Sequence, residues 1–346
     1  MTRALYAYAA RDLRLETCAV AAPGPGEVSV RLLRGGICGS DLHYFSHGGF
    51  GTVRLREPMI LGHEVAGEVT ALGDGVTELA TGDLVAISPS RPCGACGECL
   101  RGLPNHCLDM RFYGSAMPFP HIQGAFREEI VADAAQCVPA NGLSAGEAAM
   151  AEPLAVVLHA MRQAGELLGR RVIVTGCGPI GVLAILAARR AGAAEIIATD
   201  IAGPVLEFAA QAGADVVLNT AEDPDALAPY ATGKGSLDVL LECSGSAIAL
   251  AGAIPALRPC GRIVQLGLSG DMTVPMMQIT AKELSLDGSF RFHEEFAIAV
   301  QMMQGGLIDV APLITHDFAL IDYATAFETA LDRSRAMKVQ LDFAPC

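Results

Sequence analysis

Short apolar runs alternate with alanine-rich stretches through the middle of the chain. Six of these runs consist mainly of β-branched and aliphatic residues and predict buried strands, at residues 171–175, 195–199, 215–218, 237–242, 262–266 and 283–287. The stretches between several of them predict helices, at residues 180–191, 205–212 and 247–256. Strands and helices that alternate at this spacing predict an α/β fold with a doubly wound parallel sheet of the Rossmann type.

The two flanking regions have a different pattern. Residues 1–150 contain short strand-like runs, such as 27–33 and 84–87, separated by frequent glycine and proline, and the tail from Gly288 returns to this mixed character. Since about 60 residues would make a marginal domain alone, we expect the tail to pack on the first region. The expected organisation is a β-rich domain from residues 1–150 and 288–346, with a Rossmann domain at residues 151–287.

Composition and charge exclude several classes of protein. Hydrophobic residues make up 51% of the chain and charged residues 18%, which excludes a disordered chain. The net charge of −14 would be repelled by phosphate backbones, so we expect no nucleic-acid partner. The longest apolar run, residues 172–188, is at the lower length limit for a membrane span and is interrupted by glycine and proline, so we expect no membrane partner.

A glycine-rich turn joins the first two predicted elements of the Rossmann region. Gly176 permits a tight turn, Gly178 lets the backbone approach a pyrophosphate, and Gly181 allows close packing of the following helix on the strand. Asp200 ends the next strand, where its carboxylate would accept hydrogen bonds from the adenosine ribose and repel a 2′-phosphate. No arginine follows it in residues 201–203, so this pattern favours NAD over NADP.

Further residues are expected to face the cofactor because ligands bind at the carboxyl ends of parallel strands. They lie in the glycine-rich turn and after the fourth and fifth strands, and are Pro179, Ile180, Cys243, Ser244, Leu266, Gly267 and Leu268.

Four of the eleven cysteines lie within fifteen residues and have the spacing C-x2-C-x2-C-x7-C, at Cys93, Cys96, Cys99 and Cys107. Four thiolates from one lobe can close a tetrahedron around Zn²⁺ and leave no place for a substrate, so we interpret residues 90–110 as a structural zinc lobe. An iron–sulfur cluster is the alternative, although the last spacing is longer than in bacterial ferredoxins. His106 is a further possible ligand, made redundant by four cysteines. An odd total of eleven cysteines, four of them clustered, indicates metal binding in a reducing compartment, and hence the cytoplasm.

A second set of metal-binding residue types lies outside this lobe. Cys38, His63 and Glu152 offer sulfur, nitrogen and oxygen, and three protein ligands would leave one position open, which is the catalytic pattern. Taken singly, each residue also has a structural interpretation: a core cysteine, a buried histidine with satisfied hydrogen bonds, and an acidic residue at a helix N-terminus.

The combined motifs resemble the zinc-containing alcohol and polyol dehydrogenases of the medium-chain dehydrogenase/reductase superfamily. The match covers essentially the whole chain and is most specific at the family's zinc signature, formed here by Gly62, His63, Glu64, Gly67, Gly73 and Val76. The resemblance implies that the β-rich domain is GroES-like. It also implies a catalytic zinc bound by Cys38, His63 and Glu152, with Glu64 as an alternate or neighbouring ligand. Glu152 is typical of the sorbitol dehydrogenase branch, because the alcohol dehydrogenase branch has cysteine there.

The same resemblance implies a mechanism. Zinc would bind the substrate hydroxyl and lower its pKa, and hydride would pass to the nicotinamide. Ser40 and His43 match the residues that relay the proton to solvent, and Asp41 is expected to orient His63 through a hydrogen bond. Lys338 is expected to approach the pyrophosphate, and Ser289 and Arg291 to lie at the cofactor.

Several segments are similar to dehydrogenases of aldonates, in particular of L-idonate oxidised at C5; they lie at residues 34–44, 109–117, 119–121, 288–292 and 338–341. Because a buried carboxylate needs a paired cation or several hydrogen-bond donors, Arg111 or Arg291 is the candidate partner of the substrate carboxylate. Alternatively, both arginines lie at the protein surface or contact the cofactor. The other residues expected around the substrate are Tyr44, Phe112, His121 and Phe290.

Two other functions remain open from the sequence. A polyol such as sorbitol, xylitol or L-iditol could replace the aldonate as substrate. A non-catalytic NAD-binding sensor or structural protein would keep the same fold. Such a protein would be recognised by the loss of metal ligands or relay residues, and all of these are present here. The resemblance also implies a homodimer or homotetramer, with residues 283–288 as the candidate edge strand.

Overall fold

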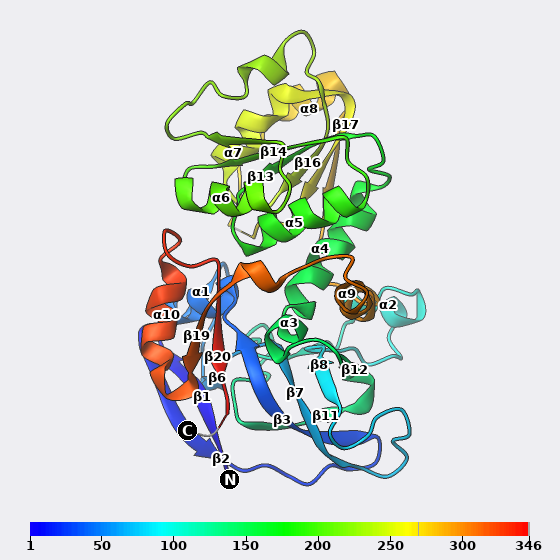
Figure 1. Cartoon of the computed structure of the whole chain (residues 1–346), viewed down its shortest axis with the longest axis vertical. Helices are drawn as coiled ribbons and strands as arrows, with labels where there is room; N and C mark the ends of the chain where they lie inside the picture. The colour runs from blue at the N-terminus through cyan, green and yellow to red at the C-terminus, as the bar shows by residue number, and fades with distance from the viewer. Residues whose placement is uncertain (269, 345–346) are drawn as a thin grey trace. The chain divides into compact units, whose positions relative to one another are not determined.

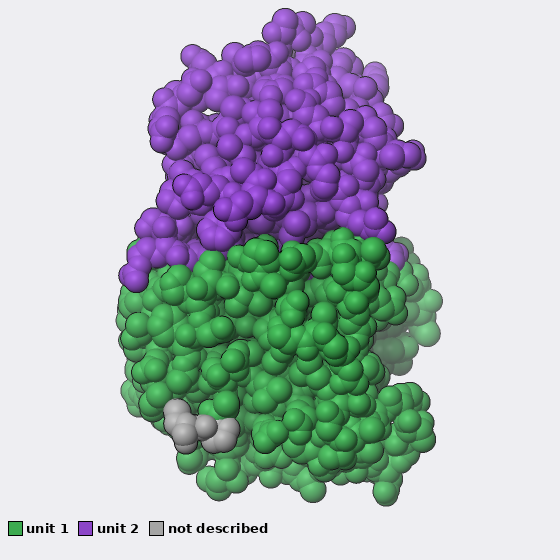
Figure 2. All heavy atoms as spheres, in the orientation of Figure 1, with its two compact units in different colours: residues 1–152, 293–332, 338–346 green, residues 153–292, 333–337 purple. Residues whose placement is uncertain are grey.

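The computed structural model describes residues 1–268 and 270–344, which form two compact units (Figure 2). Unit 1 combines Met1–Glu152 with His293–Asp332 and the chain from Lys338 onward. Unit 2 contains Pro153–Phe292 and a short return segment, Arg333–Met337. The first junction therefore follows residue 152 and not 150, and the second follows residue 292 and not 287. Residues 288–292 consequently belong to unit 2, although the sequence pattern grouped them with the other domain.

Unit 2 is built on one parallel sheet of six strands in the order β15-β14-β13-β16-β17-β18 (Figure 1). Its strands are β13 (Arg171–Thr175), β14 (Glu195–Asp200), β15 (Val216–Asn219), β16 (Leu237–Glu242), β17 (Leu257–Gln265) and β18 (Ser285–Gly288). Its helices are most of α4 (Ala151–Ala164), α5 (Pro179–Arg190), α6 (Gly203–Gln211), α7 (Ala247–Ala253) and α8 (Met276–Lys282). All six predicted strands are present, and the doubly wound parallel sheet is confirmed.

Two boundaries in unit 2 differ from the sequence pattern. Strand β17 begins at Leu257, five residues before its predicted start, and its register against β16 shifts between Leu237 and Val239. Pro259 and Gly261 make this stretch resemble a turn, yet it continues as an irregular strand. Helix α7 ends at Ala253, and a 3₁₀ turn at Ile254–Ala256 replaces its predicted last turn, where Pro255 lacks the N–H that the helix requires.

The core of unit 2 explains why its strands read as continuous apolar runs. Ile173, Ile197, Leu240 and Ile263 are fully buried in one cluster with residues from α7 and α8. A parallel sheet covered by helices on both faces buries both sides of each strand. The apolar run at residues 172–188 is thus strand β13 and most of helix α5. Among the described residues, no helix is both long and apolar enough to cross a membrane.

Unit 1 is β-rich. Its largest sheet has the order β12-β8-β7-β3-β20-β19, and β11 also pairs with β3. A three-stranded sheet has the order β2-β1-β6, and β9-β10 and β4-β5 form small ribbons. The strands are β1 (Thr2–Ala9), β2 (Asp12–Cys18), β3 (Glu27–Gly36), β4 (Gly49–Phe50), β5 (Val53–Arg54), β6 (Met59–Ile60), β7 (Glu64–Leu72), β8 (Leu84–Ile87), β9 (Ser90–Arg91), β10 (Arg111–Phe112), β11 (Glu129–Asp133), β12 (Cys137–Pro139), β19 (Ile314–Ala319) and β20 (Lys338–Asp342).

Short helices connect these strands: α1 (Gly39–His47), α2 (Gly97–Leu100), α3 (Ala145–Ala149), α9 (Glu295–Gln304) and α10 (Tyr323–Leu331). The C-terminal strand β20 pairs antiparallel with β3, with Gln340 opposite Gly36, and in parallel with β19. Strand β7 pairs with the other side of β3, with Glu64 opposite Gly36. The C-terminal strand therefore lies in one sheet with β3 and β7, beside the segments that carry the candidate metal ligands.

Candidate active site and metal centres

Three metal-binding side chains converge where strands β3 and β7 lie side by side. The ligand atoms of Cys38, His63 and Glu64 all lie within 4.8 Å of one another. Cys38 is the N-cap residue of helix α1, directly after β3, and Glu64 begins β7. Gly62 precedes His63 with a left-handed φ of 88°, and a Cβ there would overlap the Phe126 ring. Only glycine therefore allows this approach to the site.

The imidazole of His63 is held among buried groups. Its Nδ1 is buried without a hydrogen-bond partner among the described residues, and Asp41 Oδ1 lies 3.9 Å away. Asp41 instead accepts hydrogen bonds from the backbone N–H groups of Cys38, at 3.0 Å, and Gly62, at 3.1 Å. The expected hydrogen bond from His63 to Asp41 is thus not formed in this structure. Asp41 holds the two ligand-bearing segments together through their backbones.

Burial makes this donor cluster suitable for a metal ion. Desolvation raises the pKa of the Cys38 thiol to about 12, and the neighbouring Glu64 carboxylate contributes. Desolvation likewise raises the pKa of Glu152 to about 8. A divalent cation would stabilise the deprotonated forms of these groups, and sulfur, nitrogen and oxygen donors together are the ligand types that zinc takes in proteins. The residues present therefore fit a zinc ion.

Glu64 and Glu152 occupy different places relative to this cluster. Glu152 is 6% exposed, in the first turn of α4, and His63 and Cys38 act electrostatically on its carboxyl group. The compact donor group contains Glu64 and not Glu152. In this structure the carboxylate grouped with Cys38 and His63 is thus the one that the resemblance gave as the alternate ligand.

Lys338 is the charged partner of Glu64. Its Nζ donates to Glu64 Oε1 at 2.9 Å and Oε2 at 2.6 Å, and to the carbonyl of Ile37 at 3.4 Å. Both side chains are at most 3% exposed. The resemblance implied that Lys338 approaches the pyrophosphate; in this structure its ammonium group contacts Glu64. The pairing of β20 with β3 buries its ammonium group beside the metal donors, and Glu64 could bind a metal only by giving up part of this ion pair.

The four-cysteine lobe has the geometry expected of a structural metal centre. The Sγ atoms of Cys93, Cys96, Cys99 and Cys107 lie within 4.8 Å of one another. Backbone N–H groups donate to these sulfurs, among them Cys96 N to Cys93 Sγ at 3.3 Å and Leu108 N to Cys96 Sγ at 3.5 Å. Such backbone hydrogen bonds lower the pKa of Cys96 to about 6, which favours the metal-binding thiolate. His106 is exposed and is not part of the group.

The two expected proton-relay residues lie on helix α1. Ser40 is half-buried and His43 is exposed, with its ring 5.9 Å from that of Phe50. Desolvation, followed by the positive charge of His47, lowers the pKa of His43. A lowered pKa keeps the imidazole neutral near pH 7, in the form that accepts a proton.

The residues of unit 1 that are expected to bind substrate have different surroundings. Phe112 lies at the metal donors, with its ring 5.6 Å from that of His63. Its neighbour Arg111 is exposed on the small ribbon β9-β10. Tyr44 is 2% exposed, and its hydroxyl accepts a hydrogen bond from Ala116 N at 3.0 Å, which anchors the segment that follows Phe112.

His121 has a structural role that the sequence did not reveal. Its Nε2 accepts from Arg56 N at 2.9 Å, and its Nδ1 lies 2.9 Å from the carbonyl of Pro118. Both ring nitrogens are therefore occupied within the protein, and the imidazole is 5% exposed. The expectation that His121 contacts substrate is not supported by this geometry.

The last candidate substrate residues belong to unit 2. Arg291 has a left-handed φ of 57°, and its guanidinium lies 4.9 Å above the Phe290 ring. The nearby Ser289 donates its backbone N–H to Gln265 O at 3.0 Å. This bond ties the candidate cofactor segment to the end of β17.

The glycine-rich turn of unit 2 has the form that the sequence predicts. Gly176 has a left-handed φ of 84°, Gly178 is the N-cap of α5, and Pro179 and Ile180 open the helix. A Cβ on Gly181 would overlap the carbonyl oxygen of Gly176. The helix N-terminus thus follows the strand closely, as an anion-binding turn requires.

A buried carboxylate missed from the sequence organises the other cofactor loops. Glu242, the last residue of β16, is fully buried. It accepts from Ser244 N at 2.9 Å and Gly245 N at 3.0 Å, and from Gln265 Nε2 at 2.5 Å. The loop after Cys243 and the loop at residues 266–268 are thereby held together. An acidic residue inside an apolar strand was the signal that could have identified it.

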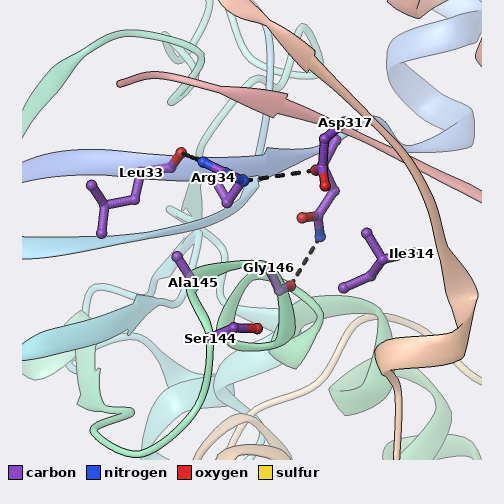
Figure 3. A pocket seen from close by; sticks show the side chains of 8 residues that line it. Leu33, Arg34, Ser144, Ala145, Gly146, Ile314 and Asp317 are labelled. Carbon is purple, nitrogen blue, oxygen red and sulfur yellow. Dashed lines mark hydrogen bonds and ion pairs between the residues drawn. The ribbon is translucent and has the colours of Figure 1, made fainter. Parts of the chain in front are cut away.

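A separate hollow of about 290 Å³ lies in unit 1 and contains none of the predicted site residues (Figure 3). Its charged groups already have partners: Arg34 Nη1 pairs with Asp342 at 2.6 Å, and Arg34 Nε lies 3.7 Å from Asp317. Gln340 Nε2 donates to the carbonyl of Gly146 at 2.9 Å. These contacts connect β3, β19 and β20 with helix α3 and have a structural role.

Comparison with known proteins identifies the family. Residues 24–142 match the alcohol dehydrogenase GroES-like domain, and residues 179–305 match the zinc-binding dehydrogenase domain. L-idonate 5-dehydrogenase (NAD(P)(+)) of Escherichia coli K12 is 43% identical over 91% of each chain. Human sorbitol dehydrogenase is 36% identical over 96% of this chain and 94% of its own. The crystal structure of L-idonate 5-dehydrogenase from Escherichia coli K-12 superposes with a TM-score of 0.94, at 40% identity over 99% of this chain and 98% of that one.

The chain therefore belongs to the zinc-binding dehydrogenase family, with an alcohol dehydrogenase GroES-like domain and a Rossmann-type domain. It is an alcohol or polyol dehydrogenase with an NAD(P)-binding fold. The alternative of a non-catalytic NAD-binding protein is thereby set aside.

The four-cysteine lobe yields a first prediction. Replacing Cys96 by serine removes one of four thiolate donors, so we expect zinc measured by mass spectrometry to fall from about two ions per chain to about one. The melting temperature should fall as well, because structural zinc contributes to folding. The control is C260S, which removes an exposed thiol outside both donor groups. Equal zinc contents in C96S and C260S would contradict the assignment.

The buried ion pair yields a second prediction. K338M leaves the Glu64 carboxylate without its cation and should lower the free energy of unfolding by about 3–5 kcal/mol in urea titrations. The double variant K338M/E64Q should recover part of this loss, because no uncompensated charge remains. R31M, which removes a cation from the exposed Arg31–Glu68 pair, is the control and should cost at most about 1 kcal/mol. A K338M protein as stable as R31M would show that the pair contributes little.

Proposed function

We propose that this chain is a zinc-dependent dehydrogenase that transfers hydride from C5 of L-idonate to NAD⁺, giving 5-dehydro-D-gluconate and NADH. The observation that carries the proposal is the buried donor cluster of Cys38, His63 and Glu64, in a chain 43% identical to an L-idonate 5-dehydrogenase. When bound, zinc supplies a Lewis acid and NAD⁺ a hydride acceptor.

The chain's own residues have three roles in this proposal. Cys38 and His63, with Glu64 or Glu152, hold the metal ion. Ser40 and His43 carry the hydroxyl proton towards solvent, which the lowered pKa of His43 favours. The turn at Gly176–Gly178 and the carboxylate of Asp200 hold the dinucleotide in unit 2.

A polyol substrate is the second candidate. It is supported by sorbitol dehydrogenases and an L-arabinitol 4-dehydrogenase of Aspergillus oryzae, at 36–37% identity over more than 90% of this chain. An aldonate differs from a polyol by one carboxylate, so the two candidates differ in their need for a cation. Arg111 is the candidate in unit 1, because it adjoins Phe112, which lies at the metal donors.

The deciding experiment compares initial rates of NAD⁺ reduction with L-idonate and with sorbitol, at matched concentrations on zinc-loaded protein. We expect a higher kcat/KM for L-idonate. R111A should raise the KM for L-idonate about tenfold, the effect of losing one charge-assisted hydrogen bond, and leave that for sorbitol nearly unchanged. R291A tests the other candidate arginine in the same way: a rise in KM for L-idonate alone would identify Arg291 as the carboxylate partner. Preference for sorbitol would reject the L-idonate assignment and retain the dehydrogenase; equal effects of R111A and R291A on both substrates would reject these two arginines as carboxylate partners.

We also propose that the chain forms a homo-oligomer. Strand β18 is an edge of the unit 2 sheet, and its Leu286 is 42% exposed. An exposed edge strand presents unpaired backbone N–H and C=O groups with which a second strand can pair. Light scattering should therefore give a mass of two or four chains, and a mass of 35.9 kDa would contradict the proposal.

The thiols of both donor groups must stay reduced to bind metal, which supports a cytoplasmic location. Cell fractionation tests this, and recovery from an oxidising compartment would exclude it.

A further inference from the structure

Asp200 is already fully hydrogen-bonded in this structure. Its Oδ1 accepts from the backbone N–H of Ile201, at 2.7 Å, and of Ala202, at 3.0 Å. Its Oδ2 accepts from Cys177 N at 2.7 Å and from Arg333 Nη2 at 3.1 Å. A carboxylate offers about four acceptor positions, so a ribose hydroxyl can bind here only by displacing a donor.

Arg333 is the donor that can leave. The other three donors are backbone amides fixed by the two turns, whereas the Arg333 side chain is 55% exposed and the Asp200 side chain only 3%. Because its guanidinium group is more than half exposed, water can solvate Arg333 when it leaves Asp200, provided that another donor takes its place on the buried carboxylate.

Arg333 also lies beside the glycine-rich turn. A Cβ on Gly178 would be 3.8 Å from Arg333 Nη2. The arginine belongs to the short return segment 333–337, which is part of unit 2, so this arrangement lies entirely within one unit. It supplies the cation next to Asp200 that residues 201–203 lack.

We propose that Arg333 determines the choice of dinucleotide, so that the chain accepts both NADP⁺ and NAD⁺. Arg333 can yield its place on Asp200 Oδ2 to the ribose hydroxyls of NAD⁺. It can equally pair with the 2′-phosphate of NADP⁺ and offset the negative charge of Asp200, which alone would repel that phosphate. This inference rests on the proposed dehydrogenase function and extends it to cofactor selection, where the local sequence around Asp200 favours NAD alone.

The test uses ligands that carry the adenosine end of each dinucleotide without the nicotinamide. Isothermal titration calorimetry of the whole protein would compare 2′,5′-ADP with 5′-AMP for the wild type, R333M and R333K. We expect R333M to weaken 2′,5′-ADP about 10- to 100-fold, as for loss of a charge-assisted bond, and to change 5′-AMP less than about threefold. R333K should recover part of the loss. R335M is the matched control, since it removes an exposed arginine two residues away and should bind both ligands like the wild type.

Two results would overturn the proposal. If R333M weakens both ligands equally, Arg333 contacts a group common to both and does not select between them. If the wild type binds 2′,5′-ADP at least a hundredfold more weakly than 5′-AMP, Asp200 dominates and Arg333 does not offset it.

Kinetics separate this inference from the proposed function. The ratio of kcat/KM for NADP⁺ to that for NAD⁺ should fall at least tenfold in R333M. A protein that oxidises neither L-idonate nor sorbitol, yet shows the expected difference in nucleotide binding, would refute the proposed function and leave the role of Arg333 intact.

Discussion

The ion pair between Lys338 and Glu64 connects the fold of unit 1 to its chemistry. A buried ammonium group is costly to desolvate, and it is tolerated here because both carboxylate oxygens and a backbone carbonyl accept its hydrogens. The pair joins β20, near the C-terminus, to β7, and β3 runs between these two strands. Cys38 follows β3 and His63 precedes β7, so the pairing of these two strands brings the metal donors together, and β20 adds the cation that holds Glu64.

The region around the metal donors therefore contains one more carboxylate than a three-ligand metal site needs. Two buried carboxylates, Glu64 and Glu152, lie near one thiol and one imidazole, and Lys338 offsets one of them. A cation that binds Cys38 and His63 can take its oxygen ligand from Glu152 while Lys338 retains Glu64, or from Glu64 if that ion pair opens. The protein thus places an internal cation, Lys338, beside the donors that would bind a metal ion.

Unit 2 also holds buried carboxylates, at its nucleotide turn. Asp200 and Glu242 are buried carboxylates at the ends of β14 and β16. Asp200 accepts chiefly from backbone N–H groups, whereas Glu242 accepts from backbone N–H groups and from the side chains of Ser244 and Gln265. These bonds give the loops at the carboxyl ends of the strands a defined shape before any ligand is present. Arg333 differs from the backbone donors because it is an exposed side chain with a full charge, and this makes it suited to discriminate between ligands.

Periodicity and local spacing determined much of this protein from the sequence alone. The six parallel strands, the glycine-rich turn and the four-cysteine lobe are local patterns, since the residues that define each lie close together along the chain. Contacts between distant residues were decided only by the tertiary structure. Lys338 meets Glu64 across 274 positions and Arg333 meets Asp200 across 133, while the ring nitrogens of His121 contact the backbone of Arg56 and Pro118. No period or motif encodes such pairs, because a charged side chain finds its partner through strand order and burial, and these exist only once the chain has folded.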